Sequence, residues 1–121
     1  MNETVSIITP CFNAEAYIQE TYESLKAQTY SEWEWIVFDD QSTDKSFSIL
    51  QDRATKDPRV KVFQNHENSG AAITRNNCLD QAQGKLVAFL DCDDLWLPKK
   101  LEIQIKFIKE NKADFIYSDY E

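Results

Sequence analysis

The sequence has few glycines, prolines, cysteines and histidines. Its 121 residues include two glycines, three prolines, three cysteines and one histidine. So little glycine and proline argues against flexible linkers and low-complexity segments. Three cysteines without a CxxC pair argue against a zinc site or a disulfide framework, and they fit the reduced thiols of a cytoplasmic protein.

Long apolar runs are also missing. None approaches the ~18 residues that would span a membrane. The N-terminal residues "MNETVSIITP" lack the pattern of a signal peptide. We therefore expect a cytoplasmic location, and membrane association of a longer protein is left open.

The sequence also has fewer basic residues than acidic ones. Lysine and arginine total 13 against 21 aspartates and glutamates, which gives a net charge of −8. A nucleic-acid backbone would be repelled, so we expect no DNA or RNA partner. An acidic protein can still bind an anionic small molecule when a divalent cation bridges the two. Apolar residues make up 42% of the chain, which is enough for one globular domain over residues 1–121.

Short apolar segments alternate with amphipathic ones along the chain. The pattern predicts strands at 4–9 (bounded by Pro10), 34–40, 60–65, 86–91 and 114–119. It predicts helices at 14–28, 43–56, 70–84 and 98–111. Asn13 is a candidate N-cap for the first helix, Ser42 or Thr43 for the second, Gly84 a candidate C-cap for the third, and Pro98 a first helical residue.

This alternation predicts an α/β fold with a Rossmann-like, doubly wound, mainly parallel sheet. The apolar run 87–90 predicts a strand that is buried on both faces. Ligands of such folds bind beyond the carboxyl ends of the strands. The polar residues that follow each predicted strand are therefore the candidates for a site.

An acidic cluster follows the fourth predicted strand, in "FLDCDDLWLPKK" (89–100). Asp91 and Asp93 are two residues apart, so they share one face while Cys92 turns inward. The sequence neighbours include no arginine or histidine to offset their repulsion. A Mg²⁺ or Mn²⁺ ion would offset it, and such ions usually bring phosphate oxygens as further ligands. The alternative is that Asp93 or Asp94 caps the following helix.

A second acidic pair, Asp39 and Asp40, ends the second predicted strand. A carboxylate there can accept a nucleobase N–H or bind a ribose hydroxyl, and the alternative is a turn with a helix cap. Pro10 and Phe12 follow the first strand and offer an apolar wall for a base. Phe12 could equally belong to the core.

Arg75 lies in the third predicted helix, after the "SG" of residues 69–70. It could act as a fork for a diphosphate. The alternative is a surface ion pair with Asp80 or Glu67.

Two long stretches resemble the family 2 glycosyltransferases. They are "VSIITPCFNAEAYIQETYESLKAQTYSEWEWIVFDDQSTD" (5–44) and "ENSGAAITRNNCLDQAQGKLVAFLDCDDLWLPKKLE" (67–102). The resemblance implies a nucleotide-diphospho-sugar transferase fold of GT-A type. It also implies sugar transfer, with inversion, from a nucleotide-diphospho-sugar, usually a UDP-sugar, to a glycan or lipid-linked acceptor. Polysaccharide assembly is the common setting of the family.

Carried over by resemblance, Pro10 and Phe12 line the base pocket, and Asp40 contacts the uracil with support from Asp39. Asp91-Cys92-Asp93 is similar to the family's DxD motif, with Asp91 toward the ribose and Asp93 holding Mn²⁺ or Mg²⁺ alone or with Asp94. The expected nucleotide-sugar-binding residues are Pro10, Phe12, Asn13, Asp39, Asp40, Arg75, Asp91 and Asp93.

The sequence also departs from the family's pattern. Asn77-Cys78 stands where a small glycine-containing step is common, and the larger departure is the extent of the chain. The family's second half supplies the acceptor site and the catalytic base, and this chain stops at "IYSDYE" (116–121). We therefore expect the donor-binding half of a longer enzyme, inactive alone, with a catalytic base beyond residue 121 and a tendency to self-associate. Two alternatives are a non-catalytic nucleotide-sugar-binding module and a Mg²⁺-binding phosphoacceptor signalling domain. The second is disfavoured because the acidic pairs follow strands two and four, not strand one.

Overall fold

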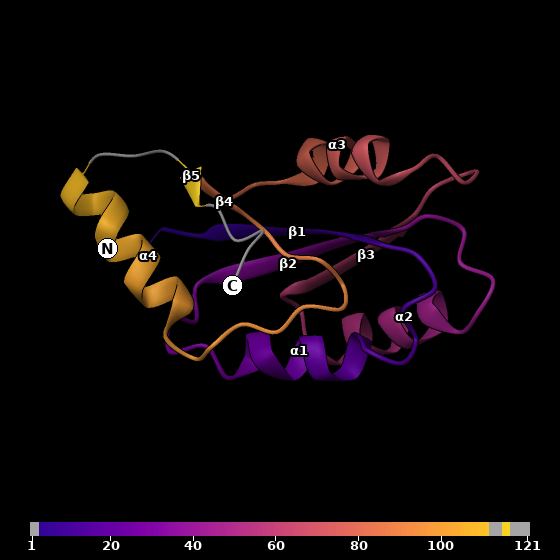
Figure 1. Cartoon of the computed structure of the whole chain (residues 1–121), viewed down its shortest axis with the longest axis horizontal. Coiled ribbons are helices and arrows are strands. Elements are labelled where there is room, and N and C mark those ends of the chain that lie inside the picture. The colour runs from indigo at the N-terminus through magenta and orange to yellow at the C-terminus, as the bar shows by residue number, and fades with distance from the viewer. Residues whose placement is uncertain (1–2, 112–114, 117–121) are drawn as a thin grey trace.

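The computed structural model describes residues 3–111 and 115–116, with side chains over residues 3–109. Strands and helices alternate strictly, as predicted (Figure 1). The elements are β1 (Val5–Cys11), α1 (Ile18–Lys26), β2 (Trp33–Asp39), α2 (Ser46–Lys56), β3 (Val60–Gln64), α3 (Ala71–Gln81), β4 (Leu86–Phe89), α4 (Lys100–Asn111) and β5 (Phe115–Ile116). The remainder of the fifth predicted strand lies outside the described residues.

The five strands form one parallel sheet in the order β3-β2-β1-β4-β5. The chain moves outward from β1 to β3 and then crosses to the other side of β1 to form β4. The strand order therefore reverses between β1 and β4. In open α/β sheets, a crevice for ligands opens at the carboxyl ends of the strands at such a reversal.

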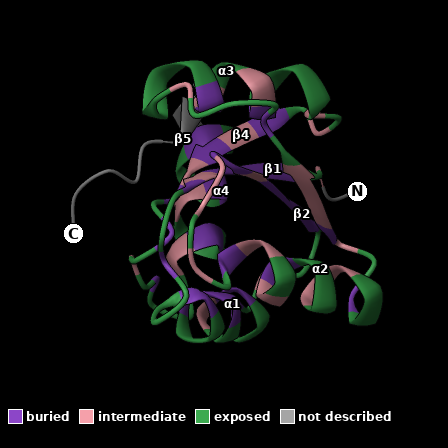
Figure 2. Cartoon of the chain, turned by 90° about the vertical axis from the view of Figure 1, so that its right-hand side faces the viewer, coloured by how far each residue is buried: buried purple, intermediate pink, exposed green. Residues whose placement is uncertain are grey.

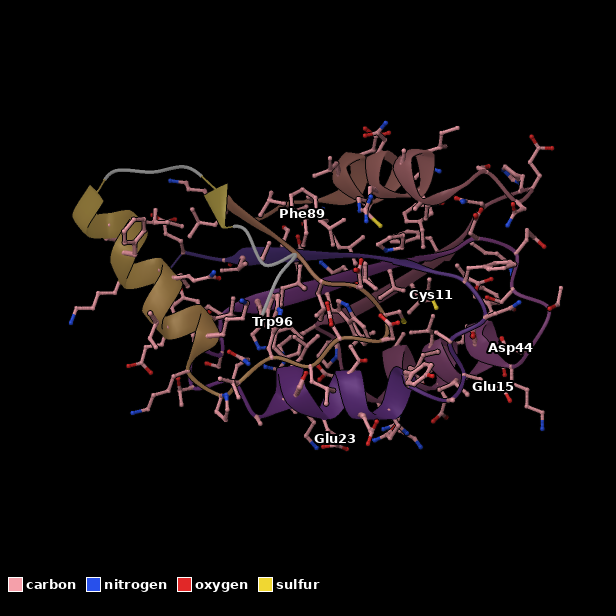
Figure 3. The ribbon with its side chains drawn as sticks, viewed as in Figure 1. Cys11, Glu15, Glu23, Asp44, Phe89 and Trp96 are labelled. Carbon is pink, nitrogen blue, oxygen red and sulfur yellow. The ribbon has the colours of Figure 1, made fainter. Side chains whose placement is uncertain are left out.

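Helices cover both faces of the sheet, which confirms the doubly wound prediction. α1 and α2 lie on one face and α3 on the other (Figure 2). Phe89 points toward the α3 side, whereas Trp96 lies on the α1 side (Figure 3). Leu101 and Ile105 of α4 join the core cluster on the α1 side. Full burial of each such side chain contributes about 1.5–3 kcal/mol.

The α3 side of the sheet is covered less completely. Among the residues described, its core cluster has three buried members, Ile8, Ile36 and Cys78. Val87 and Phe89 of β4 stay partly exposed there. The prediction that residues 87–90 are buried on both faces was therefore wrong, because the residues that α3 buries, Thr74 and Cys78, have short side chains.

Several predicted boundaries and caps were also wrong. α1 begins at Ile18, four residues late, because a turn with Tyr17 N–H bonded to the Ala14 carbonyl precedes it. α2 begins at Ser46, so Ser42 and Thr43 do not cap it. α4 begins at Lys100, two residues after Pro98.

β1 continues through Pro10, where the sequence predicted an end. β1 pairs with β4 only as far as Ile8, which lies opposite Phe89. Pro10 stands beyond that pairing, where a residue without an N–H is tolerated because no ladder bond to β4 is lost.

Gly84 serves close packing and not the predicted helix cap. α3 ends at Gln81 with Ala82 as its C-cap. A Cβ on Gly84 would lie 2.5 Å from the Thr4 carbonyl oxygen, so only glycine fits there. None of the helices in the described ranges combines the length and apolar character needed to cross a bilayer.

Candidate functional site

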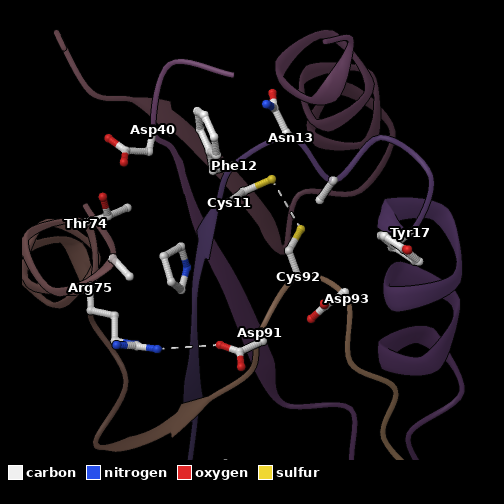
Figure 4. Close-up of a pocket in the computed structure, with 13 residues that line it drawn as sticks. Cys11, Phe12, Asn13, Tyr17, Asp40, Thr74, Arg75, Asp91, Cys92 and Asp93 are labelled. Carbon is white, nitrogen blue, oxygen red and sulfur yellow. Dashed lines mark hydrogen bonds and ion pairs between the residues drawn. The ribbon is translucent and has the colours of Figure 1, made fainter. Parts of the chain in front are cut away.

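A cavity of about 270 Å³ opens at the carboxyl ends of β1 and β4, where the strand order reverses (Figure 4). It receives side chains from the end of β1, the end of β2, the first turns of α3 and the loop after β4. Seven of the eight residues that the sequence assigned to a nucleotide-sugar site line it, namely Pro10, Phe12, Asn13, Asp40, Arg75, Asp91 and Asp93. Asp39 and Asp94 are not among the lining residues.

Phe12 and Pro10 belong to the apolar part of the lining. Phe12 is 51% exposed, so the alternative that it belongs to the core was wrong. Pro10 is half-buried. The two side chains therefore offer an apolar surface that a flat ring could contact.

Asp40 anchors the loop that leads into α3. Its Oδ1 accepts hydrogen bonds from Asn65 Nδ2 (2.8 Å) and the Ser69 amide (2.7 Å). Its Oδ2 accepts from the Gly70 amide (2.9 Å) and Asn68 Nδ2 (3.2 Å). Gly70 has φ of 92°, which favours glycine and turns this amide toward the carboxylate.

The protonation of Asp40 reflects those bonds. The side chain is only 5% exposed, and burial alone would raise its pKa. The hydrogen bonds from Asn65 and from the Ser69 and Gly70 amides outweigh burial and hold the pKa of Asp40 below its usual value. Asp40 is thus a fixed negative charge at the edge of the cavity.

Asp39 lies behind the cavity and is fully buried. Its carboxylate accepts from Ser42 Oγ at 2.5 Å, from the Ser42 amide and from Gln64 Nε2. These contacts shape the turn after β2. Asp39 is thus part of this turn, which is consistent with the predicted support of Asp40. It does not line the cavity.

Asn13 joins the loop after β1 to the loop after β2. Its backbone has φ of 49°, a conformation that asparagine tolerates better than most residues. Its side-chain Oδ1 accepts a hydrogen bond from the Thr43 backbone amide (2.8 Å), and its backbone amide donates one to Ser42 Oγ (2.9 Å). The prediction that Asn13 caps α1 was therefore wrong, because its side chain is used in a bond across the two loops.

A second link between these loops joins Glu15 and Asp44, which lie near each other in Figure 3. The Glu15 amide donates to Asp44 Oδ2 (3.2 Å), and the Lys45 amide donates to Glu15 Oε1 (2.7 Å). Asp44 Oδ1 also accepts from the Ser46 amide at the start of α2. Two loops that are 30 residues apart in sequence are thus held as one unit.

Arg75 extends from α3 across the mouth of the cavity to Asp91. Its Nη2 lies 3.6 Å from Asp91 Oδ1, and both side chains are about half exposed (42% and 53%). The alternative, an ion pair with Asp80 or Glu67, was wrong, because the partner is Asp91. The sequence neighbours of the acidic cluster include no arginine, but the fold brings in one that is 16 residues away in sequence.

The acidic cluster itself is open to solvent. Cys92 faces inward toward Cys11, and Asp91 and Asp93 flank it (Figure 4). Asp93 is exposed, and among the described residues it makes no side-chain hydrogen bond or ion pair. Partial burial and then the charges of Asp91 and Asp93 raise the pKa of Asp94.

Neither Asp93 nor Asp94 caps α4, so that alternative was wrong. α4 begins at Lys100, several residues after the cluster. The Leu101 amide in its first turn donates instead to Gln28 Oε1 (3.1 Å). The carboxylates of Asp93 and Asp94 are therefore not used to cap a helix.

Two thiols form part of the cavity lining. Cys92 Sγ donates to Cys11 Sγ over 3.3 Å. That hydrogen bond and burial raise the pKa of Cys92. The third thiol, Cys78, lies on the α3 side of the sheet, where burial raises its pKa to about 11.

Comparison with known proteins identifies the chain. The family model described as glycosyl transferase family 2 matches residues 6–120. The chain belongs to this family. The resemblance seen in the sequence is thereby confirmed.

Curated relatives from bacteria show the same relationship. The chain is 47% identical over 116 residues to the putative teichuronic acid biosynthesis glycosyltransferase TuaG of Bacillus subtilis, covering 96% of this chain and 46% of the relative. It is 43% identical over 118 residues to the UDP-Glc:alpha-D-GlcNAc-diphosphoundecaprenol beta-1,3-glucosyltransferase WfgD of Escherichia coli, covering 97% and 46%. The chain thus spans just under half the length of these relatives.

Solved structures agree in fold. S. aureus TarS 1–349 in complex with UDP-GlcNAc superposes with a TM-score of 0.84 at 38% identity, covering 92% of this chain and 32% of that one. The mannosyltransferase PcManGT from Pyrobaculum calidifontis, in complex with GDP-Man and Mn²⁺, superposes with a TM-score of 0.82 at 27% identity, covering 89% and 33%. The predicted nucleotide-sugar transferase fold is confirmed by these neighbours.

The donor atoms of the acidic cluster decide whether this chain suits a divalent cation. Over the ranges that the structure describes, no group of three or more His, Cys, Asp or Glu side chains is placed to hold an ion. The exposed carboxylate of Asp93, with Asp94 next to it, offers hard oxygen donors. Because Mg²⁺ and Mn²⁺ commonly take one or two protein carboxylates together with phosphate oxygens and water, these acids fit a cation that arrives with a phosphorylated ligand.

Sequence reasoning missed three features of the site. Tyr17 and Thr74 line the cavity, and Cys11 pairs with Cys92. Ala71, Thr74 and Arg75 all line the cavity, and their i, i+3 and i+4 spacing places them on one face of α3, so the position of Thr74 could have been inferred from helical spacing. The thiol pairing required the strand order, which no local pattern contains.

Proposed function

We propose that this chain is the nucleotide-sugar-binding half of a glycosyltransferase that takes a UDP-sugar as donor. The bound UDP-GlcNAc of the TarS neighbour, at 38% identity, supports a uridine nucleotide. The proposed reaction transfers the sugar with inversion to a hydroxyl of a glycan or lipid-linked acceptor. The name of the WfgD relative, which includes a diphosphoundecaprenol acceptor, supports the lipid-linked class.

One observation carries the proposal. Charged groups from three separated segments meet around one cavity at the reversal of the strand order, namely Asp40 after β2, Arg75 of α3 and the acids after β4. Doubly wound folds bind nucleotides at that position. Each charged group alone has an ordinary structural explanation, but their convergence does not.

The cavity suggests a role for each group. Pro10 and Phe12 form the wall against which the uracil lies. Asp40 fixes the loop before α3 and presents a carboxylate at the edge of the base pocket. Arg75 exchanges its long contact with Asp91 for the diphosphate, to which a guanidinium can donate two parallel hydrogen bonds.

The acidic cluster would hold the cation. Asp93, with Asp94 beside it, would hold Mn²⁺ or Mg²⁺, which when bound supplies positive charge that stabilises the departing diphosphate. Asp91 is then left to face the ribose. We place the base that deprotonates the acceptor in the part of the relatives' length that this chain does not span.

The strand order decides against a phosphoacceptor signalling domain. Flavodoxin-like signalling domains have the order 2-1-3-4-5, whereas this sheet has β3-β2-β1-β4-β5. A non-catalytic nucleotide-sugar-binding module would share the cavity. Turnover of a UDP-sugar by the longer protein would separate that module from an enzyme.

Thermal unfolding with and without UDP and Mn²⁺ tests the proposal. At ~100 times its dissociation constant, a ligand should stabilise the folded chain by ~2.7 kcal/mol. Asp93→Asn should abolish the Mn²⁺-dependent part of this stabilisation. Asp80→Asn makes the same change of charge at an exposed position of α3 outside the cavity and should keep it.

The result that would reject the proposal is a folded chain whose unfolding is unchanged by UDP with Mn²⁺ and by GDP with Mn²⁺. A shift that both aspartate variants lose equally would also reject the assigned role of Asp93, because it would show a general effect of net charge.

A further inference from the structure

Two thiols meet in the wall of the cavity. Cys11 stands at the end of β1 and Cys92 in the loop after β4, 81 residues later in the chain. Their sulfur atoms are 3.3 Å apart, and each residue lines the cavity (Figure 4). Cys11 is 1% exposed and Cys92 6% exposed, so the cavity is their route to small molecules.

The backbone at both positions suits a covalent link. β1 and β4 are neighbouring parallel strands with Ile8 opposite Phe89, and Cys11 and Cys92 each lie three residues further along. The Leu90 amide still donates to the Ile8 carbonyl (3.0 Å), so the two segments stay side by side one residue past the last pair of the ladder. The sulfurs, now 3.3 Å apart, would have to approach to the ~2.05 Å of a disulfide bond.

Both backbones are also held in place. The Cys11 carbonyl accepts from the Asp40 amide (2.8 Å), and the Cys92 carbonyl accepts from Thr21 Oγ1 (2.7 Å). Anchored backbones keep the two sulfurs facing each other, which favours a bond within the pair over a bond to another chain.

We propose that Cys11 and Cys92 are a modification site for small two-electron oxidants of the peroxide class, and that the resulting disulfide weakens nucleotide binding. The second half of this inference rests on the proposed function. The Cys11 sulfur attacks one peroxide oxygen, the O–O bond breaks, and a sulfenic acid and one water form. The Cys92 sulfur then attacks the oxidised sulfur and a second water leaves. One hydrogen peroxide thus oxidises two thiols to one disulfide and yields two waters.

Binding should respond because Cys92 lies between Asp91 and Asp93. A bond to Cys11 would tie the short segment that carries both acids to the end of β1 and so restrict the adjustment of the two acids to a bound cation. The disulfide also changes the wall of the cavity between the proposed base and cation positions. A bound nucleotide would in turn cover both sulfurs and slow their oxidation.

Intact-mass measurement of the 121-residue chain after hydrogen peroxide treatment tests the first half. We expect the loss of two hydrogen atoms, with reversal by a dithiol reductant. Non-reducing peptide mapping should place the link between Cys11 and Cys92 in the unmodified sequence, so the assignment does not depend on a variant that fails to fold. Cys78→Ala should still form the link, and Cys11→Ala and Cys92→Ala should not.

The inference is overturned if the thiols advance to sulfinic acids without a disulfide, or if the link contains Cys78 or joins two chains. The pair is then an ordinary buried contact between thiols.

UDP titration of the reduced and oxidised chain, with Mn²⁺ present, tests the second half. We expect about tenfold weaker binding after oxidation, which corresponds to ~1.4 kcal/mol, and slower disulfide formation when UDP is present. Equal affinity in both forms would overturn the effect on binding. No UDP binding by the reduced chain would overturn the proposed function and this second half with it, while the mass measurement decides the first half by itself.

Discussion

The two sides of the cavity use the same residue type in opposite ways. On the side formed by the loops after β1 and β2, Asp39 and Asp40 are buried and accept hydrogen bonds from several donors. On the side formed by the loop after β4, Asp91 and Asp93 are exposed. In the described structure, their side chains make one ion pair, the long contact between Asp91 and Arg75. We call the first the anchored side and the second the open side.

The difference separates construction from binding. A carboxylate that accepts several hydrogen bonds from the protein stabilises a loop, and changing it costs free energy. Carboxylates that repel each other in solvent contribute little to folding, and they are free to bind a cation. The anchored side therefore gives the cavity its shape, and the open side supplies groups for the ligand.

Asp40→Asn is the change with the largest expected effect on stability. The new amide group would point N–H donors at backbone and side-chain donors that now reach Asp40. Loss of a buried, hydrogen-bonded charge should lower the free energy of unfolding by about 2–4 kcal/mol. Urea titration measures this, and Asp93→Asn on the open side should change it by less than ~0.5 kcal/mol. Equal effects of the two variants would refute the distinction between the two sides.

Acid should remove the same contribution. The folded-state pKa of Asp40 is lowered, so its stabilisation is complete above the unfolded value of ~3.9 and is lost as pH falls through the lower, folded value. The difference in unfolding free energy between the wild type and Asp40→Asn should therefore be constant from neutral pH to about pH 5. It should decrease as the pH falls below ~3.9. Urea titrations at a series of pH values measure it. A difference that grows toward low pH would contradict the direction of the shift.

How far the sequence alone predicts this molecule follows from the same comparison. The spacing of apolar residues and the turn residues predicted, in order, the nine elements found in the described part of the chain, because each element depends on its own residues. The pairs Asp39-Asp40 and Asp93-Asp94 look alike in sequence, since both follow an apolar strand. The donors that make Asp40 an anchor, such as Asn65 and the Gly70 amide, belong to a loop after another strand, so no local pattern could tell the pairs apart.

Contacts across strands show the same limit. Arg75 reaches Asp91 and Cys11 reaches Cys92 because β4 lies beside β1. That adjacency is a property of the strand order, whereas the sequence pattern predicted a parallel sheet with helices on both faces and no order of its strands. The rim of the sheet was therefore predictable as a site, whereas the partners within it were not.

Arg75→Gln should change ligand binding more than stability. Its side chain is about half exposed, so the free energy of unfolding should change by less than ~0.5 kcal/mol. If Arg75 donates to the diphosphate, loss of this charge-assisted contact should weaken UDP binding by about 1.5–3 kcal/mol, roughly tenfold or more. Calorimetric titration with UDP and Mn²⁺ measures this. As a control, Arg53→Gln removes the same charge on α2, outside the cavity, and should leave UDP binding unchanged. Unchanged UDP binding by Arg75→Gln would reject the contact with the diphosphate.

The smallest effect is expected for the ion pair between Arg75 and Asp91. Exposed pairs at such distances contribute about 0–1 kcal/mol, because water screens the charges and two long side chains lose freedom. A double-mutant cycle with Arg75→Gln and Asp91→Asn, measured by urea unfolding without nucleotide, should give a coupling below ~1 kcal/mol that shrinks in added salt. A weak pair lets Arg75 leave Asp91 for a diphosphate at little cost. A coupling above ~2 kcal/mol would instead place Arg75 and Asp91 among the anchored residues, and the division of the cavity into two sides would have to be redrawn through α3.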